Sequence, residues 1–457
     1  MQDKFTALRD EYNSFIYNGF EISHEDDFIK IIFNFEIENL CSFGSTVKIK
    51  TDNLKLVNNF DDDTAKKIIF NLGMVELISY WKCACPKNVE IRCGSLDDMD
   101  CKWWKKLYFN GLGEFFYLNG IDTDIESFMD IKAQFSKSGA RCNFSKSDIN
   151  IIPIGGGKDS NVTLELLHRG DNLCFTVNDQ PAREESVLAS GLKGDKIIRT
   201  YRTIDPKLLH LNSAGFFNGH TPFSAIVAFL GLYCAYITGG SYIVLSNESS
   251  ANESNIEGTD INHQYSKSFE FECDFNSYVR KNITGEIHYF SLLRPFNELQ
   301  IAKQFSVFKR YHHVFKSCNA GSKKNIWCCN CAKCLFVYII LSPFIKRSEL
   351  VSIFGQDMLD KTELIEIFDG LTGFADVKPF ECIGTKREIN AALLRTYDNM
   401  VKSGEAVPKL LDYYSKRVCD NRDDFSALMK EYNEENNIPQ DFLKYVKGMY
   451  EFVSKCD

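Results

Sequence analysis

The sequence has no excess of positive charge. Of its 457 residues, 53 are Lys or Arg and 62 are Asp or Glu, which gives a formal net charge of −9. Proteins are drawn to nucleic acids and anionic bilayers chiefly through basic residues, so this balance argues against both as partners of the whole chain. A small anionic substrate would need a local basic pocket.

Long hydrophobic runs are also missing. Residues 1–5 include no apolar stretch behind a positive start, which argues against a secretory signal. The longest apolar stretches, 223–237 and 335–344, are too short to cross a membrane. We therefore expect a cytoplasmic protein without a membrane partner. Most of its 17 cysteines should then be reduced thiols, because disulfide scaffolds are small and secreted.

The chain also lacks internal repeats and low-complexity linkers, and its 44% hydrophobic and 25% charged residues are typical of a globular protein. Its length predicts two or three domains. We expect an N-terminal α/β domain over 1–145, an ATP-binding catalytic domain over 146–345, and a helical, acidic C-terminal region over 346–457. No chemical motif occurs in the last region, which predicts a packing or interface role.

The first 145 residues mix strand-like and helix-like patterns. Residues 28–35 and 47–49 read as strands, and 63–81 carries apolar residues at helical spacing after an acidic start. The aromatic-rich stretch 103–116 is explained most simply as protein core. The alternative is that it presents rings to a sugar or a base.

From residue 148 the pattern becomes a regular alternation of strands and helices. Strands are predicted at 149–154, 172–178, 196–204 and 242–246, and helices at 160–169, 183–192 and 223–237. Such alternation predicts an α/β fold with a doubly wound parallel sheet and right-handed crossovers. Ligands of such sheets bind at the carboxyl ends of the strands.

A glycine-rich string, IPIGGGKDS at 152–160, lies between a predicted strand and a predicted helix. Without side chains, the backbone N–H groups of the turn can point at a phosphate, and the helix N-terminus adds its positive end. Lys158 and Ser160 offer further donors, whereas Asp159 would need a bridging Mg²⁺ ion. The predicted ATP-binding residues are Gly155, Gly156, Gly157, Lys158, Asp159 and Ser160. A glycine turn used only for packing is the alternative.

The full string resembles the S-G-G-x-D-S signature of PP-loop ATP pyrophosphatases. That resemblance implies cleavage of ATP between the α- and β-phosphates, with transfer of AMP to a carbonyl or carboxyl oxygen. Gly155 replaces the serine of the signature, so one hydroxyl contact to pyrophosphate is missing. The common P-loop pattern does not fit, because Lys158 is followed by Asp159.

Polar strings follow two later predicted elements. The string 246–255 comes directly after a strand and includes Glu248, and the segment 262–268 contains His263 and Lys267. Side chains at these positions could line a ligand site at the sheet edge. The alternative is that both strings are ordinary solvated loops, which have the same composition.

Two further positions stand next to predicted elements. Thr221 is placed to cap the helix 223–237, with Pro222 as its first residue, which leaves His220 for chemistry. Arg294, which ends another strand, could clamp a carboxylate or phosphate or form a surface ion pair.

Four cysteines predict a metal site: Cys318, Cys328, Cys331 and Cys334, with Cys329 between them. Four thiolates bind Zn²⁺ tetrahedrally, and neighbouring lysines would offset the resulting negative charge. We therefore expect structural zinc. Buried thiols, a redox pair and an iron-sulfur cluster are the alternatives.

Several strings together resemble the UDP-N-acetylmuramoyl-L-alanyl-L-glutamate epimerase family, over roughly residues 73–344. They are GMVELISYWK at 73–82, WWKKLYFNGLGEFFY at 103–117, GGGKDS at 155–160, LNSAGFFNGHTPFSAI at 211–226, SNESSANESN at 246–255, NHQYSKSFEFE at 262–272, LLRPFNELQIAK at 292–303 and WCCNCAKC at 327–334.

This resemblance implies a reaction in which the terminal L-Glu of UDP-MurNAc-L-Ala-L-Glu becomes D-Glu, with ATP converted to AMP and pyrophosphate. The catalytic candidates are Asp159, Ser160, His220, Glu248, His263 and Lys267, and Asp159 would hold Mg²⁺. The substrate-binding candidates are Arg202, Asn247, Asn252 and Arg294. Another PP-loop adenylating enzyme, such as a 7-cyano-7-deazaguanine synthase or an amide ligase, and a silent nucleotide-binding scaffold are the alternatives.

Overall fold

The computed structural model describes residues 2–134, 147–252, 265–376, 378–379, 381, 383–418 and 424–455. Its strands are β1 (Ser14–Glu25), β2 (Phe28–Ile37), β3 (Cys41–Lys50), β4 (Asn88–Ser95), β5 (Asp130–Gln134), β6 (Asn150–Pro153), β7 (Asn172–Val177), β8 (Ile197–Thr203), β9 (Tyr242–Leu245) and β10 (His288–Ser291). Its α-helices are α1 (Gln2–Glu11), α2 (Asp63–Trp81), α3 (Asp98–Gly111), α4 (Gly113–Leu118), α5 (Lys158–Leu166), α6 (Pro181–Ala189), α7 (Pro206–Ser213), α8 (Phe223–Thr238), α9 (Phe269–Asn282), α10 (Glu298–Ser306), α11 (Ala332–Leu341), α12 (Arg347–Phe354), α13 (Ile365–Thr372), α14 (Lys386–Ser403), α15 (Lys409–Ser415), α16 (Asp424–Lys430) and α17 (Leu443–Val453).

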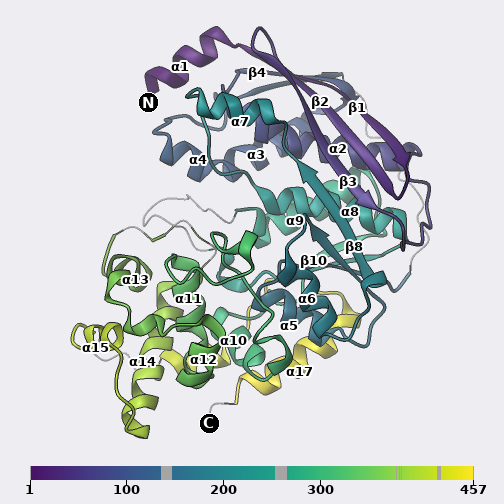
Figure 1. Ribbon diagram of the computed structural model, residues 1–457. Coiled ribbons are helices and arrows are strands. Elements are labelled where there is room, and N and C mark those ends of the chain that lie inside the picture. The colour runs from purple at the N-terminus through teal and green to yellow at the C-terminus, as the bar shows by residue number, and fades with distance from the viewer. Residues whose placement is uncertain are drawn as a thin grey trace.

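One ten-stranded mixed sheet, within the described residues, has the order β10-β9-β6-β7-β8-β3-β2-β1-β4-β5 (Figure 1). The five strands from β10 to β8 are parallel, as predicted. Strand β8 then pairs antiparallel with β3, for example Arg202 with Val47, and the sheet continues through the N-terminal strands. The fold is therefore α/β, but the parallel part belongs to a larger mixed sheet. The domain boundaries after 145 and 345 stay predictions.

The sheet separates two hydrophobic cores. Neighbouring residues of a strand face opposite sides, and so Ile151 of β6 packs into one core and Ile152 into the other. Helices α2 and α8 pack against each other in the first core, and α8 also covers β6 and β9. Helix α5 packs on β6 and β9, and α10 on α5, in the second core.

The aromatic-rich stretch belongs to the first core, which confirms the simpler interpretation. Trp104 is fully buried, and its ring centroid lies 5.3 Å from that of Phe229 in α8. Trp103 donates a hydrogen bond from its indole N–H to the Asp274 carbonyl in α9 at 3.0 Å. The rings therefore join α3 to α8 and α9.

The C-terminal region is helical, as predicted, and its last segment returns to the sheet domain (Figure 1). Asn297 Nδ2 donates to the Leu428 carbonyl at 2.8 Å, and Gln300 Nε2 donates to the Glu431 carbonyl at 2.8 Å. These bonds tie the start of α10 to α16 and the residues after it. Among the described helices, none combines the length and the apolar character needed to span a bilayer.

Candidate functional site

The glycine loop joins β6 to α5, as the sequence predicted. Its Gly157 is the N-cap of α5 and offers no side chain to the first helical N–H groups. Gly156 has a φ of +83°, and a Cβ atom there would lie 3.2 Å from Ala182 Cβ and 3.3 Å from the Arg183 backbone N. Glycine is required at 156 both for this left-handed conformation and for the close approach of α6.

Gly155 differs from its neighbour. A Cβ atom built on it would meet nothing within 4 Å. The serine of the PP-loop signature would therefore fit at 155 without displacing other atoms.

A cavity of about 380 Å³ opens beside this loop, at the carboxyl ends of β6, β7 and β9. Its lining includes four basic side chains, those of Arg183, Lys267, Lys316 and Lys333. Among the residues that the structure describes, only two acidic side chains, Asp159 and Glu248, line it. The whole chain is acidic and would repel a polyphosphate, but the local excess of positive charge in the cavity would attract one.

Lys158 does not line this cavity and is almost fully buried. Its Nζ forms ion pairs with Asp159 and Glu298. Burial alone would lower the pKa of Lys158, but the two carboxylates outweigh it and raise that pKa above its usual value. In the structure Lys158 serves an internal ion-pair network, and its contact with ATP stays a prediction.

The two carboxylates respond differently to the same lysine. Burial raises the pKa of Glu298 to about 8, although Lys158 acts in the opposite direction. For Asp159, burial also opposes ionisation, but Lys158 and Lys333 outweigh it and lower the pKa. Asp159 is therefore the ionised carboxylate that faces the cavity. Ser160, which also lines it, donates from Oγ to the Gly157 carbonyl at 3.1 Å.

The strand-end string after β9 lies at the cavity, as predicted for Asn247 and Glu248. Arg294 lies beneath these residues and is fully buried. Its guanidinium donates to the Glu248 carbonyl at 3.0 Å and to the Lys267 carbonyl at 2.7 Å. It also pairs with Glu272 at 3.1 Å. Arg294 thus holds the backbone of two cavity residues and is not part of the cavity lining.

The remaining predicted residues lie elsewhere. Arg202 in β8 pairs with Glu76 of α2, with Nε 2.9 Å from both carboxylate oxygens. Asn252 ends the short helix η2 (Ser249–Asn252), and its side chain lies outside the described part of the chain. His263 also lies outside the described residues.

His220 lies in the loop before α8, with Nδ1 3.4 Å from Glu114 Oε2. The predicted N-cap role of Thr221 is wrong, because Pro222 is the cap residue. The Thr221 hydroxyl instead accepts a hydrogen bond from Lys82 Nζ at 2.7 Å. Sequence reasoning missed Lys82, since a lysine directly after a helix is normally a surface residue.

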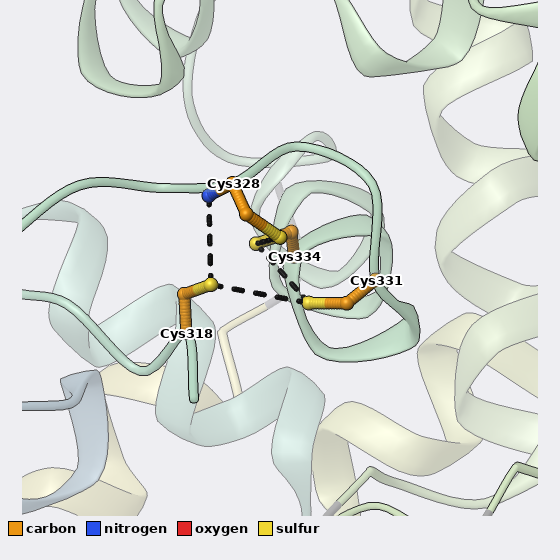
Figure 2. Close-up of side chains that lie close together, drawn as sticks. All are labelled: Cys318, Cys328, Cys331 and Cys334. Carbon is orange, nitrogen blue, oxygen red and sulfur yellow. Dashed lines mark hydrogen bonds between the residues drawn. The ribbon is translucent and has the colours of Figure 1, made fainter. Parts of the chain in front are cut away.

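The four predicted metal-binding cysteines meet at one point (Figure 2). Their sulfur atoms all lie within 4.8 Å of one another. The Cys331–Cys334, Cys328–Cys334 and Cys318–Cys331 pairs are separated by 3.5, 3.7 and 4.0 Å. Tetrahedral Zn–S bonds of about 2.3 Å place sulfurs about 3.8 Å apart, so this geometry fits one ion.

Backbone donors reinforce the cluster. The Gly321 N–H donates to Cys318 Sγ at 3.1 Å, and the Asn330 N–H donates to Cys328 Sγ at 3.5 Å. The fifth cysteine, Cys329, points elsewhere and donates to the Phe354 carbonyl at 3.2 Å. The structure therefore brings together the same four candidate ligands that the sequence predicts. No disulfide occurs among the described cysteines.

The cysteine loop also contacts the glycine loop. The Lys316 N–H donates to the Gly156 carbonyl at 2.7 Å. Lys316, Cys318 and Lys333 all line the cavity, so the cluster fixes one of its walls. Burial lowers the pKa of Lys316, although Glu185 opposes the shift. From sequence alone, these lysines are predicted only to offset the negative charge of the thiolates.

Comparison with known proteins assigns the chain to a family. A family model described as MurL N-terminal domain matches residues 6–292, and one described as MurL C-terminal domain matches residues 314–423. No solved structure matches the chain.

Three curated relatives carry the name UDP-N-acetyl-alpha-D-muramoyl-L-alanyl-L-glutamate epimerase. The protein of Xanthomonas oryzae pv. oryzae is 35% identical over 70% of this chain and 72% of its own length. That of Micromonospora sp. is 36% identical over 72% and 74%, and that of Salinispora tropica is 33% identical over 72% and 73%. Together these matches show that the chain belongs to the MurL family of UDP-MurNAc-L-Ala-L-Glu epimerases.

Proposed function

We propose that this protein converts the terminal L-Glu of UDP-MurNAc-L-Ala-L-Glu to D-Glu, with ATP cleaved to AMP and pyrophosphate. The observation that carries the proposal is a glycine loop beside a cavity rich in basic side chains, in a chain whose family is named for this epimerisation. The cavity lies at the carboxyl ends of parallel strands, where α/β sheets bind ligands.

The phosphates of ATP would lie against the glycine loop and the N-terminus of α5. Lys316 and Lys333 line the cavity near this point and would neutralise part of the triphosphate charge. Asp159 fits an Mg²⁺ ion bound to the phosphates, because its carboxylate lines the cavity and its pKa is lowered. When bound, Mg²⁺ supplies positive charge against the phosphates.

Activation by AMP explains how a glutamyl α-proton becomes removable. An ionised carboxylate opposes loss of the neighbouring proton, because the resulting enolate would place negative charge beside negative charge. Attack of the carboxylate oxygen on the α-phosphate releases pyrophosphate and forms an acyl adenylate, which removes the carboxylate charge. A base can then take the α-proton, an acid can return one to the opposite face, and water can release the product.

Zinc has a structural role in this proposal. Cys318, Cys328, Cys331 and Cys334 would hold it with no open position, as structural sites do. The ion would fix the loop whose Lys316 N–H binds the glycine loop, and with it the cavity wall. Chelation should therefore weaken ATP binding, which nucleotide titration can measure.

The direct test is incubation of the purified protein with Mg-ATP and UDP-MurNAc-L-Ala-L-Glu. AMP release and the chirality of glutamate after acid hydrolysis are the two readouts. We expect AMP together with D-Glu, and loss of both in Asp159→Asn. The matched control is Asp171→Asn, since Asp171 forms an exposed pair with Lys196 far from the cavity lining.

Other outcomes separate the alternatives. AMP without inversion would point to an amide ligase or another adenylating enzyme of the PP-loop type. Absence of both products would contradict the proposed function.

A further inference from the structure

A second group of buried and half-buried titratable side chains lies near the cavity, between the N-terminal helices and β8. We call it the N-terminal polar cluster, and it comprises Glu76, Lys82, Glu114, Arg202 and His220. Helix α2 and its C-cap, helix α4, strand β8 and the loop before α8 each contribute to it. Glu76 and Lys82 are only 1% and 6% exposed. The side chains of His220 and Glu114 are 19% and 12% exposed, so both are partly accessible to solvent.

The loop that carries His220 is held at several points. Lys82 Nζ donates to the Gly219 carbonyl, to the His220 carbonyl at 3.3 Å and to the Thr221 hydroxyl at 2.7 Å. Gly219 has a φ of +154°, and a Cβ atom there would lie 3.0 Å from Phe115 Cδ2. A glycine therefore lets the loop approach α4, which brings His220 beside Glu114.

The cluster adjoins the cavity. Val177 of β7 lines the cavity and pairs with Thr200 of β8, and Arg202 follows two residues later. With strands about 4.8 Å apart and a rise of about 3.3 Å per residue, the Arg202 Cα lies roughly 8 Å from that of Val177. Phe223 also lines the cavity and follows His220 by three residues.

Sheet order separates Arg202 of this cluster from the other predicted proton-transfer groups. The glycine loop follows β6, which lies between β9 and β7. Glu248 follows β9 and lines the cavity together with Lys267, whose carbonyl accepts a hydrogen bond from Arg294 after β10. Arg202 of the N-terminal polar cluster lies in β8, on the other side of β6 and β7. A group attached to the α-phosphate of ATP at the glycine loop would lie between the two. Lys267 is more exposed than Glu248, which is only 6% exposed.

This inference rests on the proposed function. We propose that His220, oriented by Glu114, exchanges protons with one face of the activated glutamyl α-carbon, while Lys267 serves the opposite face. His220 accepts the α-proton, and the electron pair of the C–H bond moves into the acyl carbonyl to form an enolate. The Lys267 ammonium then gives a proton to the other face as the carbonyl re-forms. Water resets both groups, so protons and electrons balance.

Lys82 is a positioning residue in this arrangement. It acts through the backbone of Gly219 and His220 and through the Thr221 hydroxyl. Arginine at this position keeps the positive charge and the donors, whereas methionine keeps only the length. Lys82→Met should therefore lower inversion relative to AMP release, and Lys82→Arg should restore part of it.

The test uses the full chain with Mg-ATP and UDP-MurNAc-L-Ala-L-Glu in D₂O. It scores AMP release, D-Glu formation and α-deuterium in the remaining L-Glu. For His220→Asn we expect AMP release within about threefold of wild type, but inversion and α-exchange at least about 100-fold lower. Glu114→Gln should give a smaller loss of the same kind. Lys267→Met should still incorporate deuterium into L-Glu, because His220 can take and return the proton on its own face.

His210→Asn is the matched control, since His210 is exposed on α7. Thermal unfolding establishes that each variant is folded. Inversion at the wild-type rate in His220→Asn would overturn the inference. Loss of AMP release in the folded variant would also overturn it, by placing His220 in adenylation. A wild-type protein that makes neither AMP nor D-Glu would instead refute the proposed function itself.

Discussion

Two buried lysines in this protein have opposite electrostatic surroundings. Lys158 is 2% exposed and Lys82 is 6% exposed, so their burial is nearly the same. Lys158 is paired with two carboxylates, and its pKa is raised. Lys82 is held by carbonyl and hydroxyl oxygens, and its pKa falls to about 8, through burial first and the Arg202 charge second. Because burial lowers the pKa of both lysines, the opposite shifts follow from the two carboxylates that Lys158 has and Lys82 lacks.

The largest expected effect comes from removing the paired lysine. Lys158→Met leaves Asp159 and Glu298 buried without their cation, which should lower the free energy of unfolding by about 3–5 kcal/mol. Denaturant unfolding measures it. Lys196→Met is the control, since its exposed pair with Asp171 should contribute less than about 1 kcal/mol. Equal losses in both variants would show that the ion pairs of Lys158 contribute little.

The second prediction concerns the lysine without a dedicated countercharge. The pKa of Lys82 is lower in the folded state than in the unfolded state, where it is near 10.5. Between pH 8 and 10.5 the unfolded state therefore binds more protons, so the stability of the wild type should rise with pH. Across this pH range, the free energy of unfolding of the wild type should rise by about 3 kcal/mol more than that of Lys82→Met. This figure follows from about 1.4 kcal/mol per unit of pKa difference.

Urea unfolding of both proteins across this pH range provides the measurement. Glu114, Cys83 and Cys85 shift the pKa of Lys82 the other way but remain in the variant. The difference between the two profiles therefore isolates Lys82. Parallel profiles would mean that Lys82 keeps an ordinary pKa.

The third prediction separates the ion pairs of Lys158 from the shape of the loop before it. Gly156→Ala leaves both pairs in place but puts a side chain at a φ of +83°, against Ala182 and Arg183. The strain should cost about 1–2 kcal/mol of stability and weaken ATP binding. Calorimetric titration with ATP and thermal unfolding measure the two effects. Unchanged ATP affinity would contradict a role of this backbone in phosphate binding.

The smallest effect should come from the adjacent glycine. Gly155→Ser places its side chain in open space and should change stability by less than about 0.5 kcal/mol. It also restores the hydroxyl of the PP-loop signature, so ATP affinity should stay the same or rise. A large loss of stability would contradict the open space that the structure shows around residue 155.

Local patterns predicted local structure well. The helix expected at 63–81 is α2, which starts where Asp62 accepts a hydrogen bond from the Ala65 N–H. The glycine loop and the four cysteine ligands also follow from spacing, because their partners lie close in sequence. These are features that depend on a few adjacent residues.

Partners far apart in the sequence could not be predicted in the same way. Glu298 lies 140 residues from Lys158, and Thr221 lies 139 residues from Lys82. Likewise, nothing in the residues of β8 or β3 alone indicates that these two strands pair. The buried position of Arg294 could not be predicted either, because it requires an ion pair with Glu272 in α9.

The attachment of the C-terminal segment to α10 has a consequence for the order of folding during synthesis. The Asn433 N–H donates to the Pro295 carbonyl at 3.0 Å, and Asn437 Nδ2 donates to Glu272 at 3.1 Å, the carboxylate that pairs with Arg294. Translation delivers residues 428–437 about 270 residues after the glycine loop. The sheet can form early, but the cavity beside the glycine loop, the proposed ATP site, should reach its final shape only once this segment has left the ribosome. Until then, a nascent chain should hold ATP poorly.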